Sequence, residues 1–403
     1  MKKILLIDDN FHSEKKGAPL FSMEREFLKN SGYNVYTISF NFNNLRTDID
    51  EEKDFFVKIK NNFFLNKVAK FFGSKEIEYQ IKTIIDEIKP DIIHNHLISK
   101  YPISVFKALP TDIPIIQTLH GPNFFCPTSW GNLKKDSSFC SLGISSKCMT
   151  SGCIPFWQYP LQYNLFSEIP ELLKKITLFH CPSKNIQKVA HSFGFSNTEI
   201  VPLGLRKNFT NIKLFKRKQS NKILFIGSLH PVKGLDYLLL AMQNIIIKNP
   251  QVQLLIAGKG SYETKYKEKV LELKIEKNVQ FLGFVDSTKI IDLFQSVDLT
   301  VVPSIWSEQF GMIGPESLAC GTPVVGSDIG GIPEWLKDKE NGLLVKPRDI
   351  NGLETKISFL LGNPELLHRY GKNGYEFINK YHTYEGYRKN LLRMIENARK
   401  NTN

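Results

Sequence analysis

Short apolar segments alternate with longer amphipathic ones along most of the chain, and this alternation restricts the fold more than any other feature. The apolar segments include "KKILLID", "YNVYTISF", "DIIHNH" and "IPIIQTLH", which are rich in β-branched residues. The segments between them carry apolar residues at helical spacing. Buried strands that alternate with helices are typical of a parallel sheet covered on both faces. The sequence therefore predicts an α/β fold.

The alternation occurs twice, which predicts two domains. It runs through residues 1–206, stops in the basic stretch 207–220, and restarts with "KILFIGS" for residues 221–380. We expect residues 207–220 to be a linker, and residues 381–403 to form a helix that packs back toward the first domain. Two doubly wound domains would face each other across a cleft, and ligands would bind beyond the carboxyl ends of the strands.

Two details of the second domain follow from local pattern. The segment "GLLVKP" is apolar and predicts one more strand. Gly371 and Gly374 lie in the helical tail that follows residue 363, and we expect them to interrupt it because glycine is a poor helix former.

The formal net charge of +13 is spread over both domains. A basic surface suits a phosphorylated small molecule or an anionic membrane surface, although a solvated lysine-rich surface explains most of these charges equally well. Nucleic acid is the least favoured partner, because the chain has no aromatic-basic RNA-binding signature and no zinc-finger repeat.

The apolar runs are too short to serve as membrane spans, which need about 18 residues. The opening stretch "MKKILLIDDN" meets Asp8 too early for a signal peptide, so it reads as a first buried strand. We expect a cytoplasmic protein, with the inner face of the membrane as an open alternative.

Four of the six cysteines lie within 28 residues. They are Cys126, Cys140, Cys148 and Cys153, in or next to an insertion at residues 121–157. A cysteine cluster of this kind in a cytosolic chain binds metal more often than it forms disulfides, but the spacing lacks a C-x-x-C pair. A structural zinc site, a redox-labile pair and free thiols all remain open. Cys181 and Cys320 read as single buried thiols.

Residues that directly follow strands are the candidates for ligand binding. In "KILFIGSLHPVKG", Gly227 permits a sharp turn after the strand, and Lys233 begins the next helix. An ammonium group beside free backbone amides suits a phosphate, whereas a solvated loop lysine is the plainer explanation. Phe284 and Val285 follow "VQFLG" and could flank a flat base.

His94, His96 and His120 end two strands of the first domain and suggest a metal trio. No carboxylate or further ligand has a suitable spacing, so we favour structural or polar roles for them. The "DID" at residues 48–50 has the letters of a D-x-D metal site, but it lies in a polar run and follows no buried strand. We therefore predict no catalytic metal.

Two glutamates stand eight positions apart in "SEQFGMIGPE". Glu308 falls in the loop after the strand "LTVVPS", and Glu316 falls in the first turn of a helix that begins near Ile313. Proline at position 315 suits that first turn, where an acid is also favourable. A surface carboxylate and a first-turn acid explain each residue alone, but not the glycine-bearing turn between them.

With its flanks, the stretch "PSIWSEQFGMIGPESLACGTPVVGSDIGGIPE" resembles the signature of the retaining glycosyltransferases of family four, which have the GT-B fold. "GSLHPVKG", "DIIHNH", "TLHG" and "GLLVKP" match in order, so the resemblance covers nearly the whole chain. The fold it implies is two Rossmann-like domains, the second of which binds a nucleotide sugar.

The resemblance also implies roles for individual residues. Glu316 would accept hydrogen bonds from the ribose hydroxyls, and Glu308 would contact the donor sugar. Lys233 would pair with the diphosphate, and His120 would face the donor sugar from the first domain. The further implied donor-binding positions are Phe310, Gly311, Met312 and Ile313 through backbone amides, Phe284 and Val285 beside the base, and Gly227, Ser228 and Gly17 in loops near the diphosphate.

This sequence departs from the family pattern at two positions. Ser228 stands where the family usually has an arginine that shares the diphosphate, so a bidentate donor is lost. Arg206 or a nearby lysine is a candidate replacement. The loop around Gly17 reads "KGAP" in place of the usual pair of glycines.

The implied activity is metal-independent, retaining transfer of a hexose from a nucleotide-diphosphate sugar, with no cofactor. We expect a saccharide or lipid-linked acceptor of surface polysaccharide or glycoconjugate biosynthesis, and peripheral contact with an anionic membrane. Three alternatives stay open: a nucleotide-sugar epimerase of the same fold, an inactive partner subunit with a degraded donor site, and a sugar-binding module.

Overall fold

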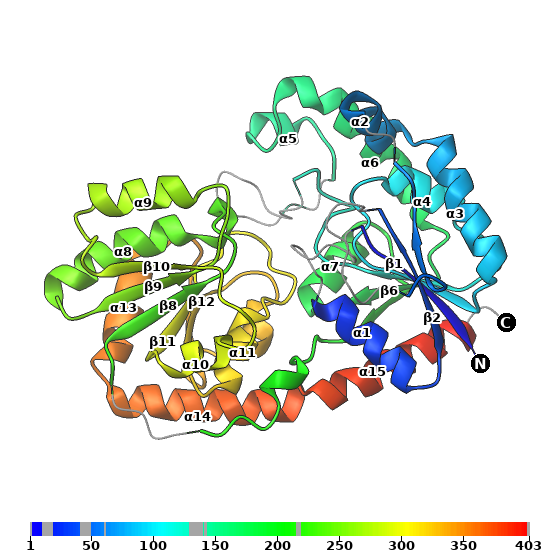
Figure 1. Ribbon diagram of the computed structural model, residues 1–403. Coiled ribbons are helices and arrows are strands. Elements are labelled where there is room, and N and C mark those ends of the chain that lie inside the picture. Colours follow the sequence, from blue (N-terminus) through cyan, green and yellow to red (C-terminus); the bar gives the residue numbers. More distant parts are fainter. Residues whose placement is uncertain are drawn as a thin grey trace. The chain divides into compact units, whose positions relative to one another are not determined.

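The computed structural model describes residues 2–9, 19–40, 50–59, 62–128, 140, 143–214 and 219–400 (Figure 1). The chain folds into two compact units. The first consists of Met1–Pro202 with Arg388–Asn403, and the second of Leu203–Tyr387. Each unit holds one parallel sheet covered by helices, so the predicted α/β class with two Rossmann-like domains is confirmed.

The sheet of the first unit has the strand order β3-β2-β1-β4-β5-β6-β7. All neighbouring strands are parallel, and in the register of β1 Ile4 pairs with Val35 and Ile92. The strands, in chain order, are β1 (Lys3–Ile7), β2 (Asn34–Ser39), β3 (Asp54–Phe56), β4 (Ile92–Asn95), β5 (Ile115–Thr118), β6 (Leu178–Cys181) and β7 (Thr198–Ile200). The chain leaves β1 toward one edge and returns to its other side at β4, which creates a reversal of strand order.

Helices of the first unit bury apolar stripes against this sheet. In α3, Ile77, Ile81, Ile85 and Ile88 recur at helical spacing and are buried, and Ser74 caps the helix by accepting a hydrogen bond from the Ile77 amide. The helices are α1 (Pro19–Asn30), α2 (Phe63–Phe72), α3 (Lys75–Ile88), α4 (Pro102–Ala108), α5 (Lys147–Thr150), η1 (Phe156–Gln158), α6 (Tyr159–Leu173) and α7 (Lys184–Ser192).

The last helix, α15 (Tyr384–Lys400), ends on the first unit. Its Glu396 accepts hydrogen bonds from Lys2 Nζ at 2.9 Å and from the Tyr33 hydroxyl at 2.5 Å, and Leu391 and Ile395 are buried. These contacts fix the C-terminal residues 388–400 beside β1 and the loop that precedes β2.

The sheet of the second unit has the order β10-β9-β8-β11-β12-β13. Its strands are β8 (Lys222–Ile226), β9 (Gln253–Ala257), β10 (Val279–Gly283), β11 (Leu299–Val302), β12 (Val324–Ser327) and β13 (Gly342–Val345). β13 is the strand expected from "GLLVKP". The strand order reverses between the neighbouring strands β8 and β11. The connections that follow these two strands run to opposite sides, which leaves room for a ligand at their carboxyl ends.

The expectation that Gly371 and Gly374 interrupt the tail helix is wrong. Helix α14 (Pro364–Tyr381) runs through both positions. A Cβ at Gly371 would lie 2.2 Å from the Gly321 carbonyl oxygen, and one at Gly374 would lie 2.5 Å from Leu318. The glycines thus let α14 pack closely on α11 (Ile313–Ala319), which outweighs their low helix propensity.

The stretch expected as a linker begins inside the second unit. Residues Lys207–Phe209 form η2, and the Phe209 ring is fully buried, 6.3 Å from the ring of Phe294. The remaining helices of this unit are η3 (Pro231–Lys233), α8 (Leu235–Lys248), α9 (Glu263–Glu272), α10 (Ile290–Gln295), α12 (Ile332–Trp335) and α13 (Ile350–Leu361).

Candidate active site

A cavity of about 250 Å³ lies in the second unit where β8 and β11 end. This is the point at which the strand order reverses, the usual ligand position in an open α/β sheet. Its lining residues come from the carboxyl ends of the two strands and the loops after them: Phe225, Ile226, Gly227, Lys233, Val301, Val302, Pro303, Ser304, Trp306, Glu308, Gln309, Gly311, Met312 and Ile313.

Lys233 and Glu308 meet at this cavity in an ion pair. Lys233 Nζ lies 2.6 Å from Glu308 Oε1, and the Ser304 hydroxyl donates to the same oxygen at 2.7 Å. The ammonium also lies 5.0 Å from the centre of the Trp306 ring. Burial favours the neutral acid, but the Lys233 charge and these hydrogen bonds outweigh it and lower the pKa of Glu308. The site therefore holds a carboxylate and an ammonium side by side.

A glycine sets the position of Lys233. Gly234 has φ +72°, and a Cβ there would lie 1.8 Å from the Pro303 carbonyl oxygen. Only glycine permits this left-handed turn to approach the end of β11 so closely. Pro231 begins the one-turn η3 before it, and its fixed φ suits a first helical position. The turn brings Lys233 to the carboxyl end of the sheet, where Ser304 and Glu308 also lie.

The backbone between the two glutamates turns at Gly311, which has φ +77°. Phe310 is fully buried, and the Trp335 indole N–H donates to its carbonyl oxygen at 2.5 Å. Gly311, Met312 and Ile313 line the cavity, whereas Phe310 anchors the turn from behind. The Phe310 ring lies 5.2 Å from the His382 ring, which packs it in the interior.

Glu316 is buried outside this cavity lining and pairs with Arg206. Arg206 Nε lies 2.8 Å from Glu316 Oε1, and its guanidinium stands 5.0 Å from the Phe209 ring. Burial raises the pKa of Glu316, and Arg206 opposes that rise. Arg206 is therefore engaged by Glu316, so this structure does not bring it to the cavity in place of the arginine missing at Ser228.

Of the remaining predicted donor-binding positions of the second unit, some line the cavity and others do not. Gly227 lines the cavity, and Ser228 follows it as an exposed residue. Phe284 is 72% exposed and follows β10, two strands away from β8, so neither it nor Val285 lines the cavity. Gly17 lies outside the described residues.

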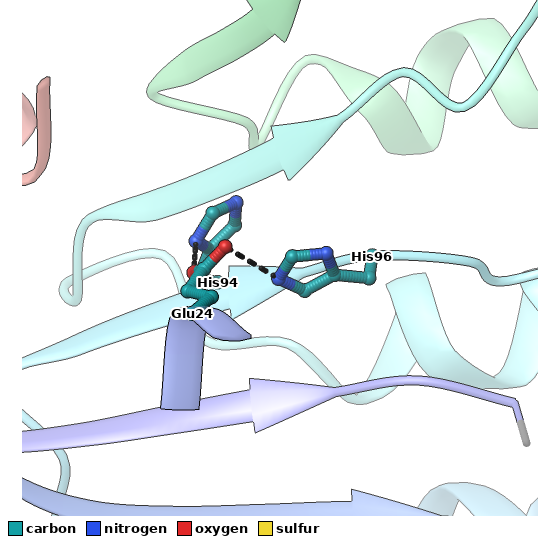
Figure 2. Close-up of side chains that lie close together, drawn as sticks. All are labelled: Glu24, His94 and His96. Atoms are coloured by element: carbon teal, nitrogen blue, oxygen red, sulfur yellow. Dashed lines mark ion pairs between the residues drawn. The ribbon is translucent and has the colours of Figure 1, made fainter. Parts of the chain in front are cut away.

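Histidines of the first unit gather around one buried carboxylate (Figure 2). Glu24, which α1 contributes, lies with Oε1 2.6 Å from His94 Nδ1 and Oε2 3.3 Å from His96 Nε2. His94 Nε2 contacts the Thr118 hydroxyl at 2.7 Å, which also contacts His180 Nδ1 at 3.0 Å. His120 Nε2 lies 3.4 Å from His96 Nδ1, so the predicted His120 joins the cluster at its edge.

No carboxylate has a suitable spacing from these histidines in the sequence, but the fold brings one to them from another helix. Glu24 lies 70 positions before His94, and only the packing of α1 on β4 brings it there. Three ligand-type side chains lie within 4.8 Å of one another. Yet nitrogen and oxygen ligands of one tetrahedral ion stand about 3.4 Å apart. The 2.6 Å contact between Glu24 and His94 is too short for two ligands of one ion and is a direct contact between the carboxylate and the imidazole.

Protonation follows from this packing. Burial alone would raise the pKa of Glu24, but the contacts with His94 and His96 outweigh burial and lower it. Burial lowers the pKa of His120 to about 3 and that of His180 to about 4, so both rings are neutral at pH 7. Burial lowers the pKa of His94. At His96 the Glu24 carboxylate outweighs burial and raises the pKa, so the positive charge beside Glu24 lies on His96.

The four clustered cysteines line one small cavity of about 10 Å³ in the first unit. Cys148 is buried, and Cys126, Cys140 and Cys153 are partly buried. All four are free thiols, and burial raises the pKa of Cys148. A volume of this size holds about one small atom or ion. The four thiols therefore line one cavity, but among the described residues no three of their sulfur atoms lie within 4.8 Å of one another, so a structural zinc site, a redox-labile pair and free thiols all stay open.

Two family models match the two halves of the chain. "Glycosyl transferase 4-like" matches residues 3–137, and "Glycosyl transferases group 1" matches residues 207–377. An uncharacterized glycosyltransferase of Methanocaldococcus jannaschii is 36% identical over 141 residues, 35% of this chain and 36% of the relative. D-inositol 3-phosphate glycosyltransferase 2 of Catenulispora acidiphila is 33% identical over 168 residues, 40% of this chain and 39% of the relative. The matched regions thus span well under half the length of these relatives.

Solved structures match the fold over nearly the whole chain. Sucrose-phosphate synthase from Thermosynechococcus elongatus superposes with a TM-score of 0.78 at 19% identity, covering 98% of this chain and 99% of that one. HepE of Anabaena, in complex with UDP and glucose, superposes with a TM-score of 0.72 at 17% identity, covering 98% and 100%. Among the described residues, no helix is both long and apolar enough to cross a membrane.

Acid should destabilise the chain partly through His180. Its pKa is about 4 in the folded chain against 6.5 ordinarily, so between those pH values only the unfolded chain binds a proton there. The free energy of unfolding therefore rises with pH in this window, by up to about 1.4 kcal/mol per pH unit for this one group. Urea unfolding at several pH values should show a shallower slope for His180→Gln. The exposed His191→Gln is the control, and equal slopes in wild type and His180→Gln would contradict the assignment.

Elemental analysis of the purified chain distinguishes the alternatives for the cysteine cluster. A structural zinc site would give about one ion per chain in protein from zinc-containing medium, because four thiolates complete a tetrahedral site, whereas free thiols would give none. Cys148→Ser should lose the ion, and Cys320→Ser, at a buried thiol of the second unit, should keep it. Zinc-free wild-type protein with four reactive thiols in the insertion would rule the site out.

Proposed function

The chain belongs to the GT-B glycosyltransferases of the family-four type, and from this premise we propose that it transfers a sugar from a nucleoside-diphosphate donor to a saccharide or lipid-linked acceptor with retention. The observation that carries the proposal is the Lys233–Glu308 pair in the cavity at the β8/β11 reversal. An ammonium beside exposed backbone amides suits a diphosphate, and a carboxylate beside it suits sugar hydroxyls. The same cavity thus provides a binding group for the diphosphate and another for the sugar of the donor.

In the proposed reaction, the bond between the sugar anomeric carbon and the diphosphate oxygen breaks, and the acceptor oxygen bonds to that carbon on the same face. The leaving phosphate takes the acceptor proton. Negative charge grows on the diphosphate as the bond breaks, so a fixed cation at Lys233 lowers the barrier. We assign no metal to this step.

Glu308 has two tasks in this proposal. Its contacts with Lys233 and Ser304 both fall on Oε1, which holds the ammonium at the cavity wall. Its other oxygen can accept a donor-sugar hydroxyl. Because the pKa of Glu308 is lowered, the group stays an acceptor rather than a proton donor. We therefore assign it a sugar-orienting role and no general-acid role.

Glu316 is proposed to accept the ribose hydroxyls. It stands one helical turn beyond Ile313 at the start of α11, and Arg206 holds its carboxylate in place. His120 is proposed to contact the donor sugar as a neutral ring, in line with its lowered pKa. Phe284 and Val285 keep their proposed place beside the base, although they lie apart from the cavity.

HepE, with a similar fold, was solved with UDP and with UDP-glucose, so we propose uridine diphosphate sugars as the first donors to test. The first assay is a thermal-shift panel of nucleoside diphosphates and their sugars. A stabilising subset supports donor binding, and no response to any of them supports an inactive partner subunit, an alternative kept open by Ser228. Free sugar products released from donor alone would support an epimerase.

Replacement of Lys233 by alanine should lower turnover, because the growing charge on the diphosphate loses its cation. The expected loss corresponds to about 2–4 kcal/mol of barrier. Lys222→Ala is the matched control, since Lys222 is exposed at the start of β8, the end of that strand away from the cavity. The measurement is the turnover number of wild type, Lys233→Ala and Lys222→Ala on the donor found in the panel. If Lys233→Ala turned over as fast as wild type, Lys233 would have no role in catalysis.

A further inference from the structure

Helix α2 exposes apolar side chains that most helices bury. None of its residues is buried, and the exposed fractions are 77% for Phe63, 72% for Phe64 and 51% for Phe72. Phe64, Val68 and Phe72 are spaced four apart, so they form one stripe on the outer side of the helix. Half-buried Ala69 and Phe71 hold the other side against the core of the first unit.

Lysines flank this stripe. The charged residues of α2 itself are Lys67 and Lys70, with no aspartate or glutamate, whereas Lys75 of the next helix is paired with Glu78 at 3.1 Å. Lys67 Nζ lies 4.7 Å from the centre of the Phe63 ring, so charge and apolar surface are interleaved. A short helix with exposed aromatic residues and flanking lysines is the arrangement that binds the interface of an anionic bilayer.

A second set of exposed aromatic residues adjoins α2 through α6. The Asn164 amide of α6 donates to the Phe71 carbonyl oxygen at 2.8 Å, and the two helices lie side by side in Figure 1. The 3-10 helix η1 runs directly into α6 and exposes 82% of Phe156 and 67% of Trp157. Tryptophan is favoured at the boundary between lipid chains and headgroups.

We propose that α2 and η1 form a docking surface for an anionic lipid bilayer, with the exposed aromatic rings inserted among the lipids and the lysines against the headgroups. A second copy of this chain fits the surface less well, since a symmetric contact would set the same lysines against one another. Only the consequence for catalysis rests on the proposed function: docking would bring the first unit to a lipid-linked acceptor.

Vesicle cosedimentation of the full chain tests the proposal and requires no donor or acceptor. The probes are phosphatidylcholine vesicles with and without one quarter phosphatidylglycerol, at low and high salt. We expect binding to the anionic vesicles that weakens as salt rises. Phe64→Ser with Phe72→Ser should weaken binding at least about tenfold by removing the inserted rings. Lys67→Glu should weaken it about fivefold or more.

Ile247→Ser with Phe359→Ser is the matched control, because these side chains are similarly exposed on α8 and α13 of the second unit. This control should bind like wild type, and unchanged far-ultraviolet circular dichroism should show that all variants fold. No binding at low salt, or equal binding by the α2 variant, would overturn the proposal. A dimer in sedimentation velocity that Phe64→Ser with Phe72→Ser abolishes would assign the surface to self-association instead. Neither outcome touches donor binding, so the proposed transferase function is judged separately.

Discussion

The ion pair between Lys233 and Glu308 is the interaction on which the candidate site depends. Both charges sit where the strand order of the second sheet reverses, and neither would be held there by local sequence alone. The Gly234 turn brings the ammonium to the end of β11, and Ser304, two residues after that strand, fixes the carboxylate. The carboxylate offsets the desolvation cost of the partly buried ammonium, so the cation is held at the cavity wall before a phosphate binds.

In the first unit, histidines rather than a lysine surround the buried carboxylate. There the Glu24 carboxylate is enclosed by His94 and His96, and further histidines extend the network through Thr118. This cluster lies at the carboxyl ends of the central strands, as the Lys233–Glu308 pair does in its own sheet. In both units, polar side chains gather where parallel strands stop and packing leaves room for them.

Much of this arrangement could be predicted from the sequence because it rests on short-range pattern. The alternation of apolar and amphipathic segments gave both sheets, and the spacing of Glu308 and Glu316 placed them on either side of the start of α11. Contacts between distant residues could not be predicted. Glu24 reaches His94 only through the packing of α1, and Arg206, which the sequence assigned to the end of the first domain, reaches Glu316 because it belongs to the second unit. The break predicted at Gly371 does not occur, because its close packing against Gly321 is a contact between separate segments that helix propensity does not describe.

We propose that the diphosphate of a nucleotide sugar binds at the carboxyl ends of β8 and β11. Hydrogen–deuterium exchange with and without uridine diphosphate tests it most directly, because protection reports on backbone amides at the site itself. We expect protection of residues 227–234 and 304–313, and loss of that protection in Lys233→Ala. If a tightly bound nucleotide protects other segments and leaves these two unchanged, the site lies elsewhere.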